Sequence, residues 1–272
     1  MKLSFNLPAT PRIALFCATF LLVCAHQALS QDSLEQARQL LQQWSQAQQA
    51  QQHQPDEANL KKLRMTTSSV AEEVPELLKR GVIEFLNSPG PHSADDLRQR
   101  VSAALRAVPS DEYQPEVSIF QLDLVRPPSY FIAYNVPYCA SCSRAWIGIV
   151  GKKAGRYAIL AETGDSFANK SLHVTRLEPN KSGKDRFLVY GTNWGDAHSR
   201  LSASAYVIDG NRLRNFWTRT DLPQGSIKVN PTEITLTFLT ALRPPWKERT
   251  EVYDILAMDQ IKLKKSFEQP AG

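Results

Sequence analysis

The spacing of apolar residues changes at Pro115, and this change constrains the fold more than any other feature of the sequence. Before Pro115, apolar side chains recur every three or four residues, as on one face of a helix. After it they alternate with polar ones, as in Ile234, Leu236 and Phe238. Nearly every connection between the expected strands is short, which favours antiparallel neighbours. The chain therefore predicts a mixed α+β fold, with an N-terminal helical segment followed by an all-antiparallel β domain.

The expected strands follow one order three times over residues 115–268. Each unit has two strands, an unusual loop, and two further strands, and the second strands start at positions 130, 186 and 233. Asp209-Gly210-Asn211 is a strong signal for a tight hairpin, because such a turn needs residues that tolerate positive φ. We therefore expect three four-strand units, arranged like propeller blades, with a β-sandwich or an open barrel as the alternative.

Residues 57–110 predict a helical segment. The motif from Ser69 to Glu72 fits a capping box, which would place Pro75 in the first turn of a helix. Ser93 and the acidic residues after it predict the start of a second helix. The apolar stripes that follow both predicted helix starts are expected to face the core.

Residues 31–56 are rich in glutamine, with 11 Gln between Gln31 and Gln54. Apolar residues recur there at helical spacing, but only as far as Trp44. Too few heptads are present for a coiled coil. Two interpretations remain, a short self-associating helix or a mobile tether with a helical start, and we favour the tether.

Residues 1–30 have the pattern of a secretory signal peptide. Basic residues precede an apolar run over 13–25, which is too short for a membrane-spanning helix, and Ala28-Leu29-Ser30 provides an exit with small residues. We expect cleavage before Gln31, no membrane span afterwards, and a secreted or periplasmic protein. A retained N-terminal anchor is the alternative.

The charge pattern argues against a nucleic-acid partner. Residues 1–30 hold two basic and no acidic side chains, so their removal lowers the formal net charge from +5 to +3. Lys262, Lys264 and Lys265 form the tightest basic group, and they alternate with apolar residues as on a solvated edge strand. The expected partner is an unknown protein or a small ligand.

The loops between second and third strands are the candidate binding sites. They cover residues 137–142, 192–198 and 243–249, and equivalent loops of a true repeat would share one rim. Large aromatic side chains and cations on loops offer stiff contact surface. The candidate binding residues are Tyr138, Trp194, Trp246 and Arg249. The alternative is that both tryptophans fold back over the core.

Cys139 and Cys142 are the cysteines that remain after cleavage. An exported protein favours a disulfide between them. A thiol–disulfide protein is the alternative, in which Arg144 would stabilise a thiolate. A zinc site would need two more ligands, and His173 and His198 are isolated, so we expect no metal and no cofactor.

Asp196 and His198 are the candidate acid/base pair for a hydrolase. The sequence has no dinucleotide fingerprint, P-loop, zinc-protease helix or G-x-S-x-G elbow. We therefore expect an exported, non-catalytic binding protein. The alternatives are the thiol–disulfide protein, this hydrolase, and a structural component of the cell envelope.

Overall fold

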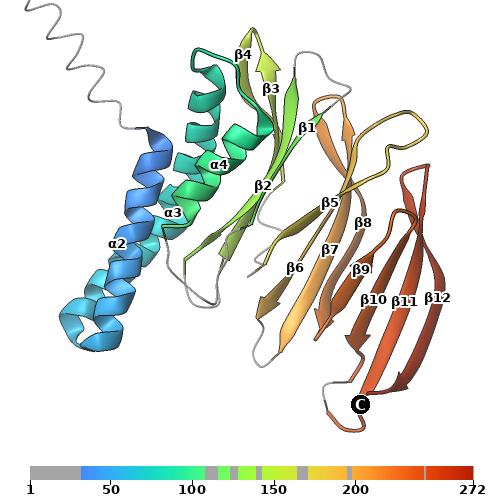
Figure 1. Ribbon diagram of the computed structural model, residues 1–272. Helices are drawn as coiled ribbons and strands as arrows, with labels where there is room; N and C mark the ends of the chain where they lie inside the picture. The colour runs from blue at the N-terminus through green and yellow to red at the C-terminus, as the bar shows by residue number, and fades with distance from the viewer. Residues whose placement is uncertain are drawn as a thin grey trace, which may run out of the picture.

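The computed structural model describes residues 32–107, 116–122, 128–138, 143–163, 171–194, 198–241 and 243–271 (Figure 1). These residues form three helices followed by twelve strands. The helices are α2 (Ser33–His53), α3 (Glu57–Asn87) and α4 (Ala94–Leu105). The expected signal peptide, residues 1–30, lies outside the described residues.

Local chemistry fixes where each helix begins. The Asp32 carboxylate accepts a hydrogen bond from the backbone N–H of Leu34, and the Asp56 carboxylate accepts one from Asn59. At α4, Ser93 and Asp96 form a reciprocal capping box, so the predicted helix start is confirmed. The predicted start near Ser69 is wrong, because the Asp56 cap begins α3 earlier and Pro75 lies inside the helix.

The glutamine-rich segment is docked on the body of the protein, which corrects the expectation of a mobile tether. α2 lies along α3 (Figure 1), and its Leu41 and Trp44 are buried in the first core. The two helices approach closely at Gly81, where an added Cβ would come within 2.5 Å of Leu34 Cγ. The Trp44 indole also donates to Thr67 Oγ1 at 3.1 Å. The glutamines lie on a helix whose other face is apolar and packed.

The strands form three sheets of four, each with its strands in consecutive order and antiparallel. The first sheet contains β1 (Val117–Leu122), β2 (Ser129–Pro137), β3 (Ser143–Lys153) and β4 (Arg156–Glu162). The second contains β5 (His173–Leu177), β6 (Arg186–Trp194), β7 (Ser199–Asp209) and β8 (Arg212–Pro223). The third contains β9 (Ser226–Val229), β10 (Glu233–Leu239), β11 (Lys247–Leu256) and β12 (Gln260–Pro270).

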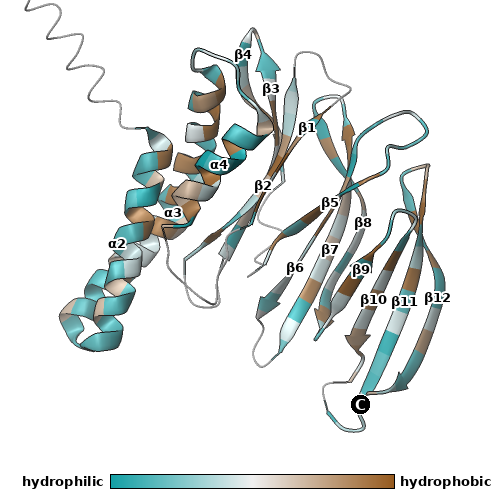
Figure 2. Ribbon diagram, in the orientation of Figure 1, coloured by the Kyte–Doolittle hydropathy of each residue, from teal (hydrophilic) through white to brown (hydrophobic). Residues whose placement is uncertain are grey.

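The sheets stack face to face, and the helices cover the outer face of the first sheet (Figure 1). Three apolar cores lie between successive layers, and Figure 2 shows the apolar residues along the facing sides of α3 and β2. Between the first two sheets, the rings of Phe131 and Phe187 stack with centroids 4.0 Å apart. Between the second and third, Trp217 meets Tyr253 edge to face at 5.3 Å.

The mixed α+β class and the antiparallel strands are confirmed, but no described sheet closes on itself, so neither a barrel nor a closed propeller is found among the described residues. The second strand of each sheet starts at Ser129, Arg186 and Glu233, close to the expected positions. The hairpin at Gly210 joins β7 to β8 as predicted. β12 is an edge strand, as its lysines indicated.

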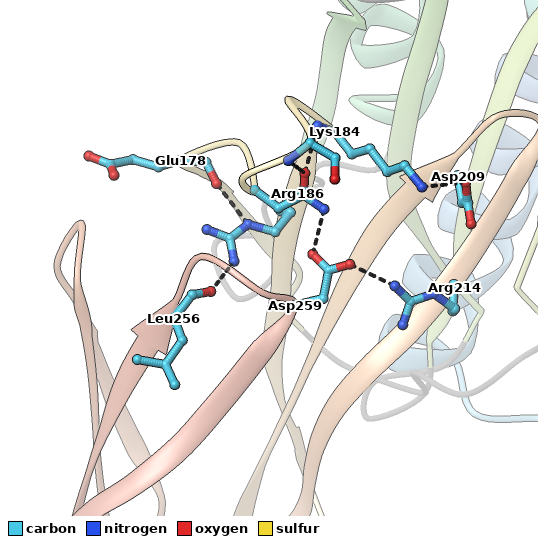
Figure 3. Close-up of polar contacts among 9 residues, drawn as sticks. Glu178, Lys184, Arg186, Asp209, Arg214, Leu256 and Asp259 are labelled. Carbon is cyan, nitrogen blue, oxygen red and sulfur yellow. Dashed lines mark hydrogen bonds and ion pairs between the residues drawn. The ribbon is translucent and has the colours of Figure 1, made fainter.

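Polar contacts join the second and third sheets at the end that carries the β11–β12 turn (Figure 3). The buried guanidinium of Arg186 donates to the carbonyl oxygens of Glu178 at 2.7 Å and Leu256 at 2.6 Å. Asp259, in the β11–β12 turn, accepts hydrogen bonds from Arg214 at 2.7 Å and Asn180 at 2.9 Å. Because the contacts to Leu256 and Asp259 cross between segments far apart in the sequence, this group fixes the third sheet against the second.

Candidate functional site

A pocket of about 390 Å³ lies between α3 and the first sheet. α3 supplies one wall, and β2, β3 and the end of β4 supply the other. Its volume is within the range of about 300 to 1,000 Å³ that is usual for ligand sites. The lining residues are Pro75, Glu76, Lys79, Tyr134, Arg144, Ala145, Trp146, Glu162 and Thr163.

Pro75 leaves a backbone carbonyl oxygen of α3 available to Arg144. Proline has no backbone N–H, so the carbonyl of the residue four positions earlier, Ala71, lacks its helical hydrogen bond. Arg144 Nη1 donates to that carbonyl oxygen at 3.3 Å. The Arg144 guanidinium, from β3, therefore has a hydrogen-bond acceptor on α3 at the rim of the pocket.

Gly148 determines how the Trp146 side chain lies on the sheet. An added Cβ at Gly148 would come within 2.4 Å of Trp146 Cζ2, so the indole occupies the space that a side chain would take. Gly148 pairs with Glu162 across the β3–β4 ladder. The indole therefore reaches Glu162, and Trp146 Nε1 donates to its carboxylate at 2.6 Å.

Lys79 connects two carboxylates in the pocket. Its Nζ lies 3.0 Å from Glu76 Oε1 and 3.1 Å from Glu162 Oε2. Burial disfavours the charged form of Lys79, but the bonds to both glutamates outweigh it and raise its pKa. Burial likewise opposes the ionised form of Glu162, but the bonds from Trp146 and Lys79 lower its pKa. Both groups are therefore charged at neutral pH.

The hydroxyl of Tyr134 is the unusual group of this pocket. The side chain is fully buried, and the hydroxyl has no hydrogen-bond partner among the described residues. Burial, followed by the nearby charges of Glu76 and Glu162, raises its pKa well above 10. A buried hydroxyl without a partner costs free energy, so native proteins rarely leave one. Tyr134 is thus a protonated donor buried in the wall of the pocket.

A second groove, of about 590 Å³, lies between α2 and α3. Glu76 lines this groove as well as the first pocket, so its side chain separates the two hollows. α2 contributes a stripe of glutamines at spacings of three and four, which lie on one helix face. These are Gln36, Gln39 and Gln43.

The candidate binding residues from the sequence are placed in different environments. Tyr138 packs against the first core. Trp246 is 42% exposed, and Arg249 forms an ion pair with Glu268. For Trp194 the structure describes the backbone, at the end of β6. Figure 1 shows the ends of β2, β6 and β10 at the same end of the stack. The expected loops are shorter than predicted, because residues 192–194 belong to β6 and residues 247–249 to β11.

The candidate reactive residues are only partly described. Cys139, Cys142 and Asp196 lie outside the described residues. His198 Nδ1 lies 3.2 Å from Gln224 Nε2. His173 forms an ion pair with Glu116 at 2.7 Å and stacks on Tyr190, so its contacts are those of a structural histidine between sheets. Within the described ranges, no three His, Cys, Asp or Glu side chains are grouped as metal ligands.

The sequence analysis missed the pocket between α3 and the first sheet. Glu162 and Arg144 are visible in the sequence as isolated charges beside a strand. Pro75 offered the clearest signal, because a proline inside a helix frees a carbonyl oxygen that another group must satisfy. The capping box predicted from Ser69 to Glu72 instead places Pro75 in a first turn, where a proline frees no carbonyl oxygen.

Comparison of the chain with models of protein families, with curated proteins and with solved structures found no match. None of the helices in the described part of the chain is both long and apolar enough to cross a membrane.

Proposed function

We propose that this protein binds a small or extended polar ligand in the pocket between α3 and the first sheet. The observation that carries the proposal is the Tyr134 hydroxyl, which lies within the wall of the pocket, shielded from solvent and without a hydrogen-bond partner among the described residues. A ligand would reach it by displacing the side chains that cover it. A ligand that accepts this hydrogen bond would repay the cost of burying the group. Ligand binding would then account for a buried hydroxyl that lowers the stability of the free protein.

Binding fits the electrostatics of the pocket better than acid–base catalysis. A general acid or base works best with a pKa near the operating pH. Here the bonds between Lys79 and the two glutamates raise the pKa of Lys79 and lower that of Glu162, so both move away from neutrality. Fixed charges of this kind orient a ligand without exchanging protons with it.

The proposal keeps the export expected from residues 1–30 and the disulfide expected between Cys139 and Cys142. β2 and β3 carry Tyr134 and Arg144 and are joined by loop 137–142. A disulfide would constrain the connection between these two strands in an oxidising compartment. We further propose that the three sheets are blade-like repeats, and that the partner is not a nucleic acid.

A screen of chemically distinct probes tests the binding function. Amino acids, dipeptides, dicarboxylates, nucleosides and neutral sugars would be tested by ligand-observed NMR on the purified protein. At least one class should bind, and Glu162→Gln should weaken that binding at least about tenfold, because a charged acceptor is lost. Glu268→Gln is the matched control, since this carboxylate pairs with Arg249 outside the pocket. If no class binds, or both variants lose binding equally, the pocket is not the site.

A second variant tests how the pocket is built. Pro75→Ala restores a backbone N–H to α3, which then competes with Arg144 for the carbonyl oxygen of Ala71. The helix should become more stable while ligand affinity falls. Equal loss of stability and affinity would instead mean that Pro75 serves the fold alone.

A further inference from the structure

We infer that the ligand is a neutral, hydroxyl-rich chain, an oligosaccharide, that lies across α3 and occupies the pocket and the α2–α3 groove together. This inference rests on the proposed function and specifies its ligand. The two hollows are lined by different residues but share Glu76. A ligand that fills both must therefore cross the helix at that side chain.

The charge of the combined surface favours a neutral ligand. In the first pocket, two carboxylates are balanced by the cations Lys79 and Arg144. The groove adds Glu72, Glu73 and Arg80, which leaves a surplus of one negative charge over the whole surface. A strongly charged ligand of either sign would meet as much repulsion as attraction there.

The lining of the two hollows contains both hydrogen-bond donors and acceptors. Lys79 and Arg144 carry donors, while the carboxylates of Glu76 and Glu162 carry acceptors. Gln43 on α2 adds an amide, which both donates and accepts. A sugar hydroxyl also does both, so a chain of hydroxyls can match such a wall at many points. The inference gives the glutamine-rich helix α2 a role that its packing alone does not require.

An extended peptide is the competing ligand, and the lining disfavours it. Peptides are usually anchored by apolar side chains that enter apolar pockets. The apolar residues that line the groove are Leu40 and Leu77, and Leu77 is only 8% exposed because it belongs to the first core. The remaining side chains that line the groove are polar or charged.

Calorimetric titration with neutral oligosaccharides tests the inference. Chains of one to six units built from glucose, galactose, mannose or N-acetylglucosamine would be titrated into the purified protein. For at least one series, affinity should rise at least about tenfold between the shortest chain that binds and the longest, because the longer chain reaches the second groove. In Gln43→Ala this gain should shrink, while the affinity for the shortest chain stays unchanged.

The outcomes separate the inference from the proposed function. If dipeptides or amino acids bind and sugars do not, the pocket is a binding site but the inferred ligand is wrong. If sugars bind with affinity independent of length, or Gln43→Ala weakens all lengths equally, the crossing of α3 is refuted. If no probe of any class binds, both the inference and the proposed function fail.

Discussion

Replacing Tyr134 by phenylalanine should make the protein more stable and weaken ligand binding. The substitution removes a single hydroxyl and keeps the ring, which packs against Trp146 with centroids 5.2 Å apart. Burying an unsatisfied polar group costs about 1–3 kcal/mol. Because no described residue bonds this hydroxyl, its removal should raise the free energy of unfolding by about 1 kcal/mol.

Tyr253→Phe is the matched control, with the opposite expected sign. Tyr253 is also buried, but its hydroxyl donates to the carboxylate of Glu251 at 2.5 Å. Deleting this hydroxyl leaves a buried carboxylate with one bond fewer, which should lower the free energy of unfolding by about 1.5–3 kcal/mol. The two variants remove the same atom from buried tyrosines in different layers of the stack.

Urea unfolding at neutral pH, followed by circular dichroism and analysed by linear extrapolation, measures both effects. The slope of the transition should stay constant in both variants, so that a shift of midpoint reports stability. If Tyr134→Phe destabilises the protein as Tyr253→Phe does, the Tyr134 hydroxyl is satisfied in solution. The pocket would then lose the observation on which its function was proposed.

Three further predictions concern the fold. Leu41→Ala should lower the free energy of unfolding by about 2–5 kcal/mol in the same urea assay, because α2 is docked; a free tether would show almost no change. Asp259→Ala should lower the free energy of unfolding by about 1–3 kcal/mol, because it leaves Arg214 and Asn180 without their acceptor, whereas Asp209→Ala, which breaks an exposed pair with Lys184, should have a smaller effect. The hydrogen bond to Glu116 raises the pKa of His173 against the effect of burial, so its stabilising effect is present below the unfolded value of about 6.5 and is lost as pH rises through the folded value. Glu116→Gln should therefore reduce stability more near pH 6 than near pH 8, as measured by thermal unfolding at both pH values.

Structural features that depend on a few neighbouring residues were predictable from the sequence. Asp209-Gly210-Asn211 makes its turn through its own backbone preferences, and Ser93 caps α4 through a residue three positions away. The alternation along β10 depends only on which face is buried. In each case the cause lies within a few residues of the effect, so one sequence contains it.

Features that join distant segments were not predictable. α2 docks because Gly81 leaves space for Leu34, which lies 47 positions earlier in the chain. The pocket needs Pro75 to free a carbonyl, Arg144 to reach it from another element, and Gly148 to let an indole lie flat. Each of these residues has an ordinary structural role when read alone. Only their positions in space bring them to one site.

The difference between the two buried tyrosines also explains why the candidate site is placed beside the helices. Between the second and third sheets, Glu251 accepts hydrogen bonds from both Tyr253 and Arg219, so its charge is used within the protein. Beside α3, Glu76 and Glu162 are joined through Lys79, and Tyr134 remains without a described partner in the wall of the pocket. A polar group whose bonds are complete serves the fold, whereas a buried donor left without one lowers stability unless something else binds it. Arg219 Nε in the group between the sheets also lacks a described partner, so what distinguishes the group beside α3 is that it lines a pocket of about 390 Å³.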